Sequence, residues 1–333
     1  MTDPATVRVG RTDLFVPRIG LGTAALGNFQ QAISDADAVA VLDRALARGV
    51  RYLDTAPLYG HGLAESRVGQ AVAKVSRDGL IISTKVGRLL REGAARDDTQ
   101  YHDGVPFYRE VPAAGPVWDF SYDGVRRSVE ESLERTGVDR FDVLLLHDPD
   151  QHLAAAASTG YAALRDLRAA GLVRAIGAGM NNSAPLAELV RSCDLDVVLL
   201  AGRYTLLDQA ALSDLLPACE ARGVSVVIGG VFNSGVLIDP AAGASFDYIP
   251  AGDEVLAKAA AIREVCQRYD VPLAAAALRF PLAHPRVCMV LVGPRTVDEL
   301  EMDLALFDAE IPADLWTDLR CAGLLDPDVP TPE

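Results

Sequence analysis

The sequence predicts a (β/α)8 barrel, a TIM barrel, with an amino-terminal β-hairpin and long loops at its carboxyl-terminal face. Eight short apolar runs alternate with eight stretches of helical periodicity, which implies a parallel sheet. The run 143–146 is apolar on both faces, as a strand is when helices cover one side and side chains fill the other. The alternative, an open doubly wound sheet, usually carries G-x-G-x-x-G after its first strand, and the glycines at 20–27 have another spacing.

The elements follow one another in a regular order along the chain. A hairpin is expected first, with strands at 7–9 and 14–16 joined by a polar turn. The barrel strands are predicted at 19–23, 50–53, 80–84, 141–146, 173–178, 195–200, 224–228 and 287–292. The helices are predicted at 36–48, 65–75, 122–136, 160–170, 184–191, 209–221, 254–269 and 297–307. We therefore expect a single (β/α)8 barrel domain over residues 1–333.

Two connections are longer than a barrel needs. Residues 87–121 mix polar, glycine, proline and aromatic residues and are too irregular to be one helix, and residues 232–252 carry several glycines and prolines. Loops of such length in a compact domain are usually functional or disordered. Both follow the carboxyl ends of predicted strands, where barrel enzymes build their active sites.

Composition argues against several classes of partner. A formal net charge of -15 opposes binding to nucleic acid or to an anionic membrane, because both need a concentrated basic surface. The five cysteines form no C-x-x-C pair and no metal-ligand spacing, so we expect neither a disulfide framework nor a metal site. Residues 1–10 lack the apolar core of a signal peptide, and no run reaches about 18 apolar residues, so we expect a cytoplasmic protein. The sequence gives no indication of the oligomeric state.

Four side chains that handle protons follow the ends of three successive predicted strands. Asp54 ends the second barrel strand, Tyr59 lies in the loop after it, Lys85 ends the third and His147 ends the fourth. Taken alone, Asp54 is equally well explained as a loop cap, Tyr59 as a packed aromatic and His147 as a hydrogen-bonded strand-end histidine. Lys85 is harder to dismiss, since the chain has three lysines against 28 arginines. Together they predict a catalytic site.

The chemistry of these four groups is proton transfer. A phenol with a pKa of about 10 is a poor acid or base at neutral pH, but a cation within about 4–6 Å favours its phenolate. Lys85 would supply that cation, Asp54 would hold Lys85 in place, and His147 would hydrogen-bond the reacting oxygen or share the proton transfer. The set contains no metal cage and no activated serine or cysteine, so a cofactor would carry the redox chemistry.

The motifs 54–60, 83–85 and 145–148 resemble the catalytic tetrad of the aldo-keto reductases, and the resemblance extends from 19–23 to 293–300. It implies a barrel that binds NAD(P)(H) across its carboxyl-terminal mouth. It also implies that Tyr59 is the general acid/base, that Lys85 and Asp54 tune it, and that His147 orients the substrate.

The same resemblance implies a set of cofactor contacts. A helix amino terminus near 293–296 is a natural anion site, and Glu299 matches the family position near the adenine. The usual aromatic after the seventh strand is replaced by Gly229 or Gly230, and Asp303 stands where many members have asparagine, so NAD and NADP both remain open. The expected contacts are Gly22, Thr23, Asn181, Phe232, Asn233, Ser234, Gly235, Leu237, Gly293, Arg295, Thr296, Glu299 and Asp303.

The substrate is expected to be a small molecule. The stretches 118–124, 147–150 and 200–207 are similar to a bacterial branch of aldose dehydrogenases acting on fucose-like sugars, which also includes pyridoxal dehydrogenases. This implies oxidation of an aldose hemiacetal to its lactone, with Trp118, Phe120 and Asp148 in the substrate pocket. The alternatives are a pyridoxal dehydrogenase, an NADPH-dependent reductase of aldehydes and ketones, and a nucleotide-binding regulatory barrel without turnover. A metal-dependent hydrolase is a weaker alternative, because no third ligand is visible.

Overall fold

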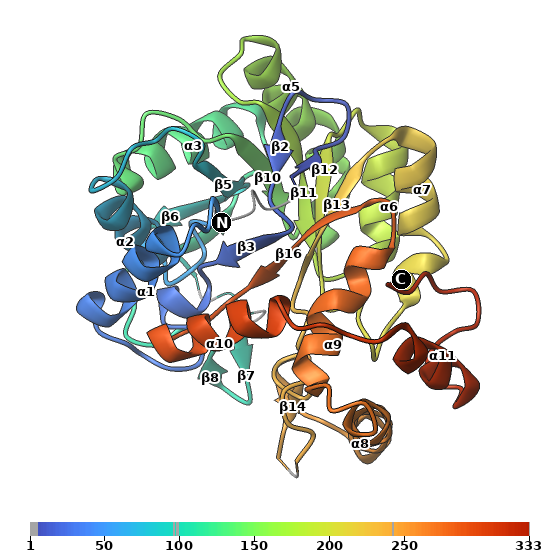
Figure 1. Ribbon diagram of the computed structural model, residues 1–333. Coiled ribbons are helices and arrows are strands. Elements are labelled where there is room, and N and C mark those ends of the chain that lie inside the picture. The colour runs from blue at the N-terminus through green and yellow to red at the C-terminus, as the bar shows by residue number, and fades with distance from the viewer. Residues whose placement is uncertain (1–5, 96, 98–99, 242, 333) are drawn as a thin grey trace.

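A computed structural model describes residues 6–95, 97, 100–241 and 243–332. Eight parallel strands close into a barrel in the order β10-β11-β12-β13-β16-β3-β4-β5, which confirms the predicted fold class (Figure 1). Every predicted run overlaps one of them, with ends that differ by at most two residues. They are β3 (Ile19–Gly22), β4 (Tyr52–Asp54), β5 (Ile81–Val86), β10 (Val143–His147), β11 (Ala175–Met180), β12 (Val197–Ala201), β13 (Ser225–Gly229) and β16 (Val287–Val292).

Helices surround the barrel, and each predicted segment overlaps one. Helix α3 (Tyr122–Thr136) begins after Ser121, whose side chain accepts a hydrogen bond from the Gly124 N–H, and ends at left-handed Gly137. The predicted start at residue 209 is wrong, because a 3-10 turn (Ala210–Leu212) comes first and α7 begins after Asp214. The helices are α1 (Asp35–Ala47), α2 (Leu63–Val72), α3, α5 (Tyr161–Ala169), α6 (Ser183–Ser192), α7 (Leu215–Arg222), α8 (Asp253–Gln267) and α10 (Val297–Phe307).

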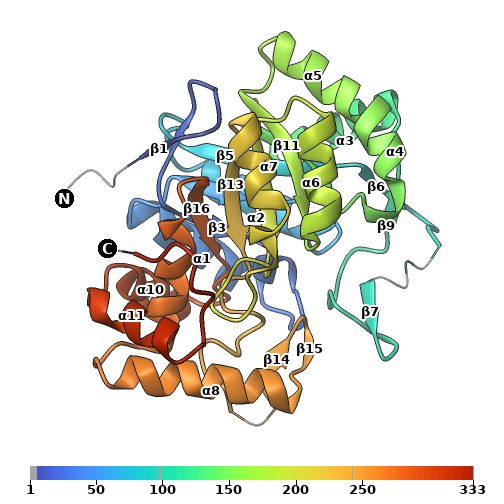
Figure 2. The same cartoon turned by 90° about the vertical axis from the view of Figure 1, so that its right-hand side faces the viewer.

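Two further helices and a short one, α4 (Leu153–Ala155), were not predicted. Helix α9 (Leu273–Arg279) packs against α10, and α8 packs against α9 and α11 (Ala313–Cys321) rather than on the strands (Figure 2). Residues 273–278 of α9 are all buried, so this segment lacks the polar face that produces a helical pattern.

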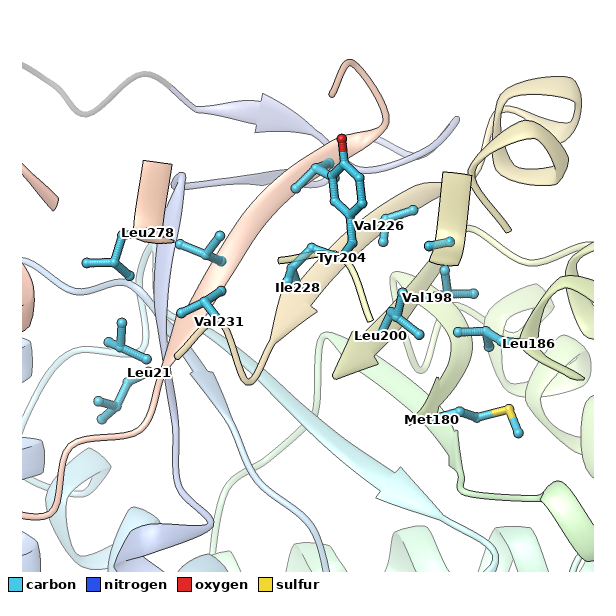
Figure 3. Close-up of a cluster of buried hydrophobic side chains, with 14 of the residues drawn as sticks. Leu21, Met180, Leu186, Val198, Leu200, Tyr204, Val226, Ile228, Val231 and Leu278 are labelled. Atoms are coloured by element: carbon cyan, nitrogen blue, oxygen red, sulfur yellow. The ribbon is translucent and has the colours of Figure 1, made fainter. Parts of the chain in front are cut away.

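The barrel has an inner and an outer apolar core. The outer one lies between strands and helices and includes Leu21, Val198 and Ile228, which face Leu186 of α6 and Leu278 of α9 (Figure 3). The inner core fills the barrel itself and is closed by the predicted hairpin, β1 (Val7–Arg8) and β2 (Phe15–Val16). The site therefore rests on a packed scaffold that is closed at its amino-terminal end.

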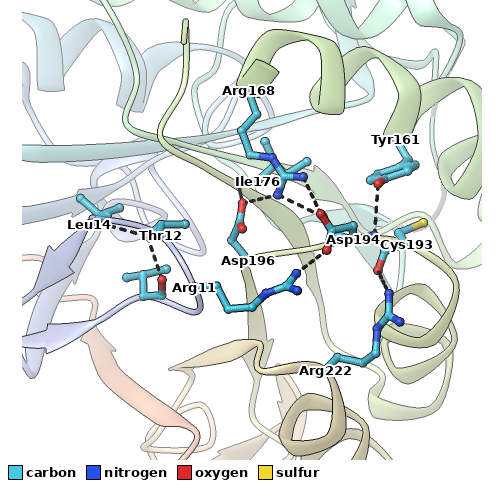
Figure 4. A network of polar contacts seen from close by, with 11 residues as sticks. Arg11, Thr12, Leu14, Tyr161, Arg168, Ile176, Cys193, Asp194, Asp196 and Arg222 are labelled. Atoms are coloured by element: carbon cyan, nitrogen blue, oxygen red, sulfur yellow. Dashed lines mark hydrogen bonds and ion pairs between the residues drawn. The ribbon is translucent and has the colours of Figure 1, made fainter. Parts of the chain in front are cut away.

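Charged side chains fasten this hairpin to the barrel. Arg11 in the hairpin turn forms an ion pair with Asp194, which also binds Arg168 of α5 at 2.8 Å (Figure 4). Arg168 reaches Asp196 at 2.7 Å, and Asp196 in turn accepts a hydrogen bond from the Ile176 N–H at 3.0 Å. This network lies at the end of the barrel opposite the catalytic strand ends.

Both long connections lie at the carboxyl-terminal end, as predicted, and both contain hairpins. In the first, β6 (Arg88–Arg91) pairs with β9 (Gly115–Trp118), and β7 (Tyr101–His102) pairs with β8 (Val105–Pro106). In the second, β14 (Ser245–Phe246) pairs with β15 (Ile249–Pro250). Figure 1 places β7, β8 and β14 at the opposite end of the molecule from β2. Within the described residues, no helix is both long and apolar enough to span a membrane.

Candidate active site

The four predicted proton-handling residues converge at the carboxyl ends of adjacent strands. The Lys85 ammonium on β5 donates hydrogen bonds to Asp54 Oδ2 at 2.6 Å, to the Tyr59 hydroxyl at 2.8 Å and to the Thr55 carbonyl at 3.1 Å. The side chains of Lys85 and Asp54 are 2% and 3% exposed. A buried charge pair with several hydrogen bonds holds its geometry and is shielded from water.

Ser83 is a residue that the sequence reasoning did not assign to the site. It pairs with Asp54 across β4 and β5, and its hydroxyl donates a hydrogen bond to Asp54 Oδ1 at 2.7 Å. Each carboxylate oxygen of Asp54 therefore has its own partner. Ser83 precedes Lys85 by two positions, so the period of two along a strand was the available signal.

Two glycines fix the loop that carries Tyr59. Gly60 has a φ of +65°, and a Cβ there would lie 2.3 Å from the carbonyl oxygen of Gly27. A Cβ on Gly27 would in turn lie 2.6 Å from the backbone of Tyr59. The two backbones are thus in direct contact, and this contact sets the position of the Tyr59 ring above Lys85.

The electrostatics of Tyr59 differ from the prediction. Burial, followed by the charges of Asp54 and Asp148, raises the pKa of Tyr59 well above its usual value. The expected lowering of the Tyr59 pKa by Lys85 is outweighed by these effects, and Asp54, at 2.6 Å from Lys85, offsets part of the ammonium charge. Tyr59 is consequently a protonated phenol at neutral pH.

His147 stands beside Tyr59 as a neutral imidazole. The two ring centroids are 5.8 Å apart, and the rings are nearly perpendicular, at 86°. Burial, then the nearby charges of Arg88 and Lys85, lowers the pKa of His147 well below its usual value. A neutral imidazole offers one N–H donor and one acceptor to a bound oxygen.

These groups lie in a cavity of about 830 Å³ at the carboxyl-terminal mouth of the barrel. Most of the predicted cofactor and substrate residues line it as well, namely Gly22, Trp118, Asp148, Asn181, Phe232, Ser234, Gly235, Gly293, Arg295 and Glu299. Sequence reasoning missed Arg88, Tyr108 and Tyr248, which also line the cavity. Tyr108 and Tyr248 come from the irregular loops, where no periodicity gives their direction.

Six predicted site residues lie outside the lining of this cavity. Thr23 binds the Asp54 carbonyl at 2.9 Å, and Asn233 donates to the Gly202 carbonyl at 3.0 Å. Phe120 stacks behind Trp118, with ring centroids 5.8 Å apart. These three support the wall from behind. The remaining members are Leu237, Thr296 and Asp303.

The glycines of the cavity wall fit a bound dinucleotide. A Cβ at Gly22, Gly179 or Gly229 would come no closer than 3.6 Å to the rest of the protein, so packing does not require glycine at these positions. The missing side chains instead leave the wall open to a molecule in the cavity. Gly229, one of the two glycines that replace the family's usual aromatic residue, is one of them.

The amino terminus of α10 is capped by its own side chains. Thr296 accepts a hydrogen bond from the Glu299 N–H at 3.1 Å, and Glu299 accepts one from the Arg295 N–H at 2.6 Å. Asp298 and Glu299 place two acidic residues in the first turn. The protein's own side chains thus partly fill the predicted anion site. The two carboxylates in this first turn also repel a phosphate group that would bind there.

Asp303, one turn further along α10, makes a testable contribution to stability. Burial, and then Glu299, raises its pKa to about 7, so the folded state retains a proton that the unfolded chain releases near pH 4. The resulting destabilisation grows as the pH rises from about 4 to 7 and is constant above. At about 1.4 kcal/mol per pKa unit, Asp303→Asn is expected to raise the free energy of unfolding at pH 8 by up to about 4 kcal/mol.

Urea unfolding of both proteins between pH 5 and pH 8 measures this gain, which is expected to shrink towards pH 5. The exposed Asp308→Asn, at the end of the same helix, is the matched control and should change stability by about 0.5 kcal/mol or less at every pH. An Asp303→Asn effect independent of pH would show that Asp303 carries no such penalty.

The buried Asp54-Lys85-Tyr59 chain and the neutral histidine can transfer protons at the mouth of a closed barrel, and the cavity beside them can hold a further molecule. The chain belongs to the aldo/keto reductase family, whose model matches residues 18–322. The protein is thus an NAD(P)-dependent oxidoreductase.

Individual relatives agree over nearly the whole chain. D-threo-aldose 1-dehydrogenase from Pseudomonas sp is 41% identical over 340 residues, covering 99% of both chains. Pyridoxal 4-dehydrogenase from Microbacterium luteolum is 40% identical, covering 95% of this chain and 97% of that protein. Among solved structures, the holo form of an aldo-keto reductase from Bacillus halodurans has a TM-score of 0.76 at 25% identity, with 98% of each chain covered.

Proposed function

We propose that the enzyme oxidises the cyclic hemiacetal of an aldose, of the fucose type, to a lactone. The observation that carries the proposal is the hydrogen-bonded chain in which Lys85 Nζ joins Asp54 at 2.6 Å and Tyr59 at 2.8 Å. The likeness to an aldose 1-dehydrogenase at 41% identity supports the substrate class.

In the proposed reaction the carbon-oxygen single bond at C1 becomes a double bond. Bound NAD(P)+ supplies the acceptor for the hydride that leaves C1. The ionised form of Tyr59 takes the proton of the C1 hydroxyl, and Lys85, 2.8 Å away, is the cation that faces the phenolate oxygen. His147 hydrogen-bonds the same substrate oxygen and orients it. The products are a lactone, the reduced cofactor and one proton.

We propose that the cofactor lies along the glycine wall. Asn181 would bind the carboxamide, and the turn 232–235, in which Asn233, Ser234 and Gly235 all have positive φ, would present its backbone to the pyrophosphate. The other contacts proposed are Gly22, Phe232, Gly293, Arg295 and Glu299 in the wall, with Thr23, Leu237, Thr296 and Asp303 supporting them from behind.

A second candidate substrate is pyridoxal, since a pyridoxal 4-dehydrogenase is 40% identical. A panel of aldoses, pyridoxal and simple aldehydes, assayed with both cofactors in both directions, separates the candidates. The proposal expects reduction of NAD(P)+ with an aldose. Activity with pyridoxal alone, or rapid reduction of simple aldehydes with NADPH but no aldose oxidation, would contradict it. A regulatory barrel would show no turnover at all.

The acidic first turn of α10 leads to a prediction about the cofactor. If Glu299 lies at the adenosine end, its carboxylate repels a 2′-phosphate, so NAD+ is expected to be preferred over NADP+ by at least about tenfold in kcat/KM. Glu299→Gln keeps an oxygen to accept the Arg295 N–H and removes the charge. It is expected to raise kcat/KM for NADP+ about tenfold, an effect of about 1.4 kcal/mol, with little change for NAD+. A native preference for NADP+ would contradict this account.

A further inference from the structure

Arg88 is a buried cation at the cavity that the proposed reaction does not use. It begins β6 and pairs with Trp118 of β9, and its guanidinium lies 3.8 Å from the centre of the Trp118 ring. Trp118 stacks in turn on Phe120. Gly87, with a φ of +99°, makes room for this stack, since a Cβ there would lie 2.0 Å from the Phe120 ring. The position of the guanidinium is therefore fixed by packing.

The guanidinium keeps unused hydrogen-bonding capacity. Its side chain is 3% exposed, and Nη2 donates to Asp148 Oδ2 at 3.1 Å. Nη1 lies 3.8 Å from Asp97 Oδ2, beyond hydrogen-bonding distance. Within the part of the chain that the structure describes, Nε and Nη1 have no hydrogen-bond partner. A guanidinium carries five N–H groups, and Nη2 uses one of its two on Asp148, so this residue of the cavity lining has donors left for a ligand group.

Asp148 links this cation to the reacting centre. It follows His147 directly and has a φ of +41°, a conformation that aspartate tolerates, and its Oδ2 lies 3.5 Å from His147 Nε2. His147 is the residue proposed to bind the C1 oxygen. A substrate group that binds Asp148 and Arg88 would therefore be attached to an atom next to C1.

The charges around Arg88 select the chemistry of that ligand group. Asp148, at 3.1 Å, already offsets the single positive charge of Arg88, which disfavours a phosphate or a carboxylate. A hydroxyl group both donates and accepts, so it donates to the Asp148 carboxylate while accepting from the guanidinium. A polyhydroxylated substrate offers such a group on the carbon beside C1.

We propose that Arg88, acting with Asp148, is a specificity-determining residue that binds the hydroxyl group at C2 of the aldose. The inference rests on the proposed function, because it assumes a sugar whose C1 is oxidised. It extends that function by naming a substrate group, beside the oxidised carbon, that the enzyme binds.

The test compares two sugars in two proteins, L-fucose and 2-deoxy-L-fucose with the native enzyme and with Arg88→Met. Methionine keeps the aliphatic contact with Trp118 and removes the donors. Loss of a hydrogen bond to a charged group is worth about 10- to 100-fold, so Arg88→Met is expected to lower kcat/KM for L-fucose by that factor. The 2-deoxy sugar has no C2 hydroxyl and therefore no hydrogen bond to Arg88. For this sugar, Arg88→Met is expected to change kcat/KM by less than about threefold.

Arg91→Met is the matched control, because Arg91 lies on the same strand but binds Glu131 of α3 at 2.9 and 3.0 Å, away from the cavity. Arg91→Met is expected to leave kcat/KM for both sugars unchanged. Titration of the variants with NADH, followed by fluorescence, checks that the cofactor site is intact.

Equal losses on both sugars in Arg88→Met would mean that Arg88 acts only through the packing of the loop, and would overturn the inference while leaving the proposed function standing. A native enzyme that oxidises neither sugar with either cofactor would overturn the proposed function and the inference together. The two failures are thus distinguishable in one set of assays.

Discussion

Replacing Tyr59 with phenylalanine is expected to lower kcat for aldose oxidation about 100- to 10,000-fold, the usual contribution of a positioned acid-base group. The ring and its packing remain, and only the hydroxyl that binds Lys85 at 2.8 Å is lost. Because burial and Asp54 raise the pKa of Tyr59 well above its usual value, the fraction of phenolate increases with pH throughout the neutral range. The oxidation rate of the native enzyme should therefore increase from pH 7 to pH 10, and the residual rate of Tyr59→Phe should not.

Tyr204→Phe provides the matched control for this change. Tyr204 is fully buried in the outer core, and its hydroxyl has no hydrogen-bond partner within the described residues (Figure 3). Removing that hydroxyl should leave turnover and its pH dependence unchanged. A Tyr59→Phe enzyme that keeps native kcat and the native pH profile would refute the assignment of Tyr59 as the acid-base group.

The second large effect is expected for Lys85. Lys85→Met leaves the Asp54 carboxylate buried without its cation, which typically costs about 3–5 kcal/mol of stability, in addition to the loss of turnover. Urea unfolding and steady-state kinetics of the purified variant measure the two effects separately.

The double variant Lys85→Met with Asp54→Asn separates stability from catalysis. Replacing Asp54 with asparagine removes the unpaired charge. The Ser83 hydroxyl, which donates to Asp54 at 2.7 Å in the native enzyme, can still donate to the amide oxygen. Most of the lost stability should therefore return, while turnover stays low. Recovery of turnover along with stability would show that Lys85 matters for folding and not for proton transfer.

The features that the sequence predicted well depend on local pattern. Barrel strands such as β10 are apolar on both faces, and α3 carries both of its end signals, Ser121 and Gly137. The polar residues at successive strand ends then come together because parallel strands share one carboxyl-terminal edge. This rule was sufficient to predict that Asp54, Lys85 and His147 lie close together.

The features that the sequence did not predict depend on contacts between residues that are far apart in the chain. Helix α9 is buried along 273–278 and so shows no amphipathic period. Arg88 is one of 28 arginines, and only its pairing with Trp118 in the irregular loop brings it to the cavity. The direction of the Tyr59 pKa depends on burial and on the competing charges of Asp54 and Asp148, which residue spacing does not give.

The most direct test of the account uses L-fucose labelled with deuterium at C1. After incubation with the enzyme and NAD+ or NADP+, mass spectrometry of the reduced cofactor and of the sugar product reports where the label goes. We expect one deuterium in the reduced cofactor and an unlabelled lactone, because the deuterium at C1 is transferred to the cofactor as deuteride. A reduced cofactor without deuterium, or no lactone while pyridoxal is converted, would contradict the proposed oxidation of an aldose at C1.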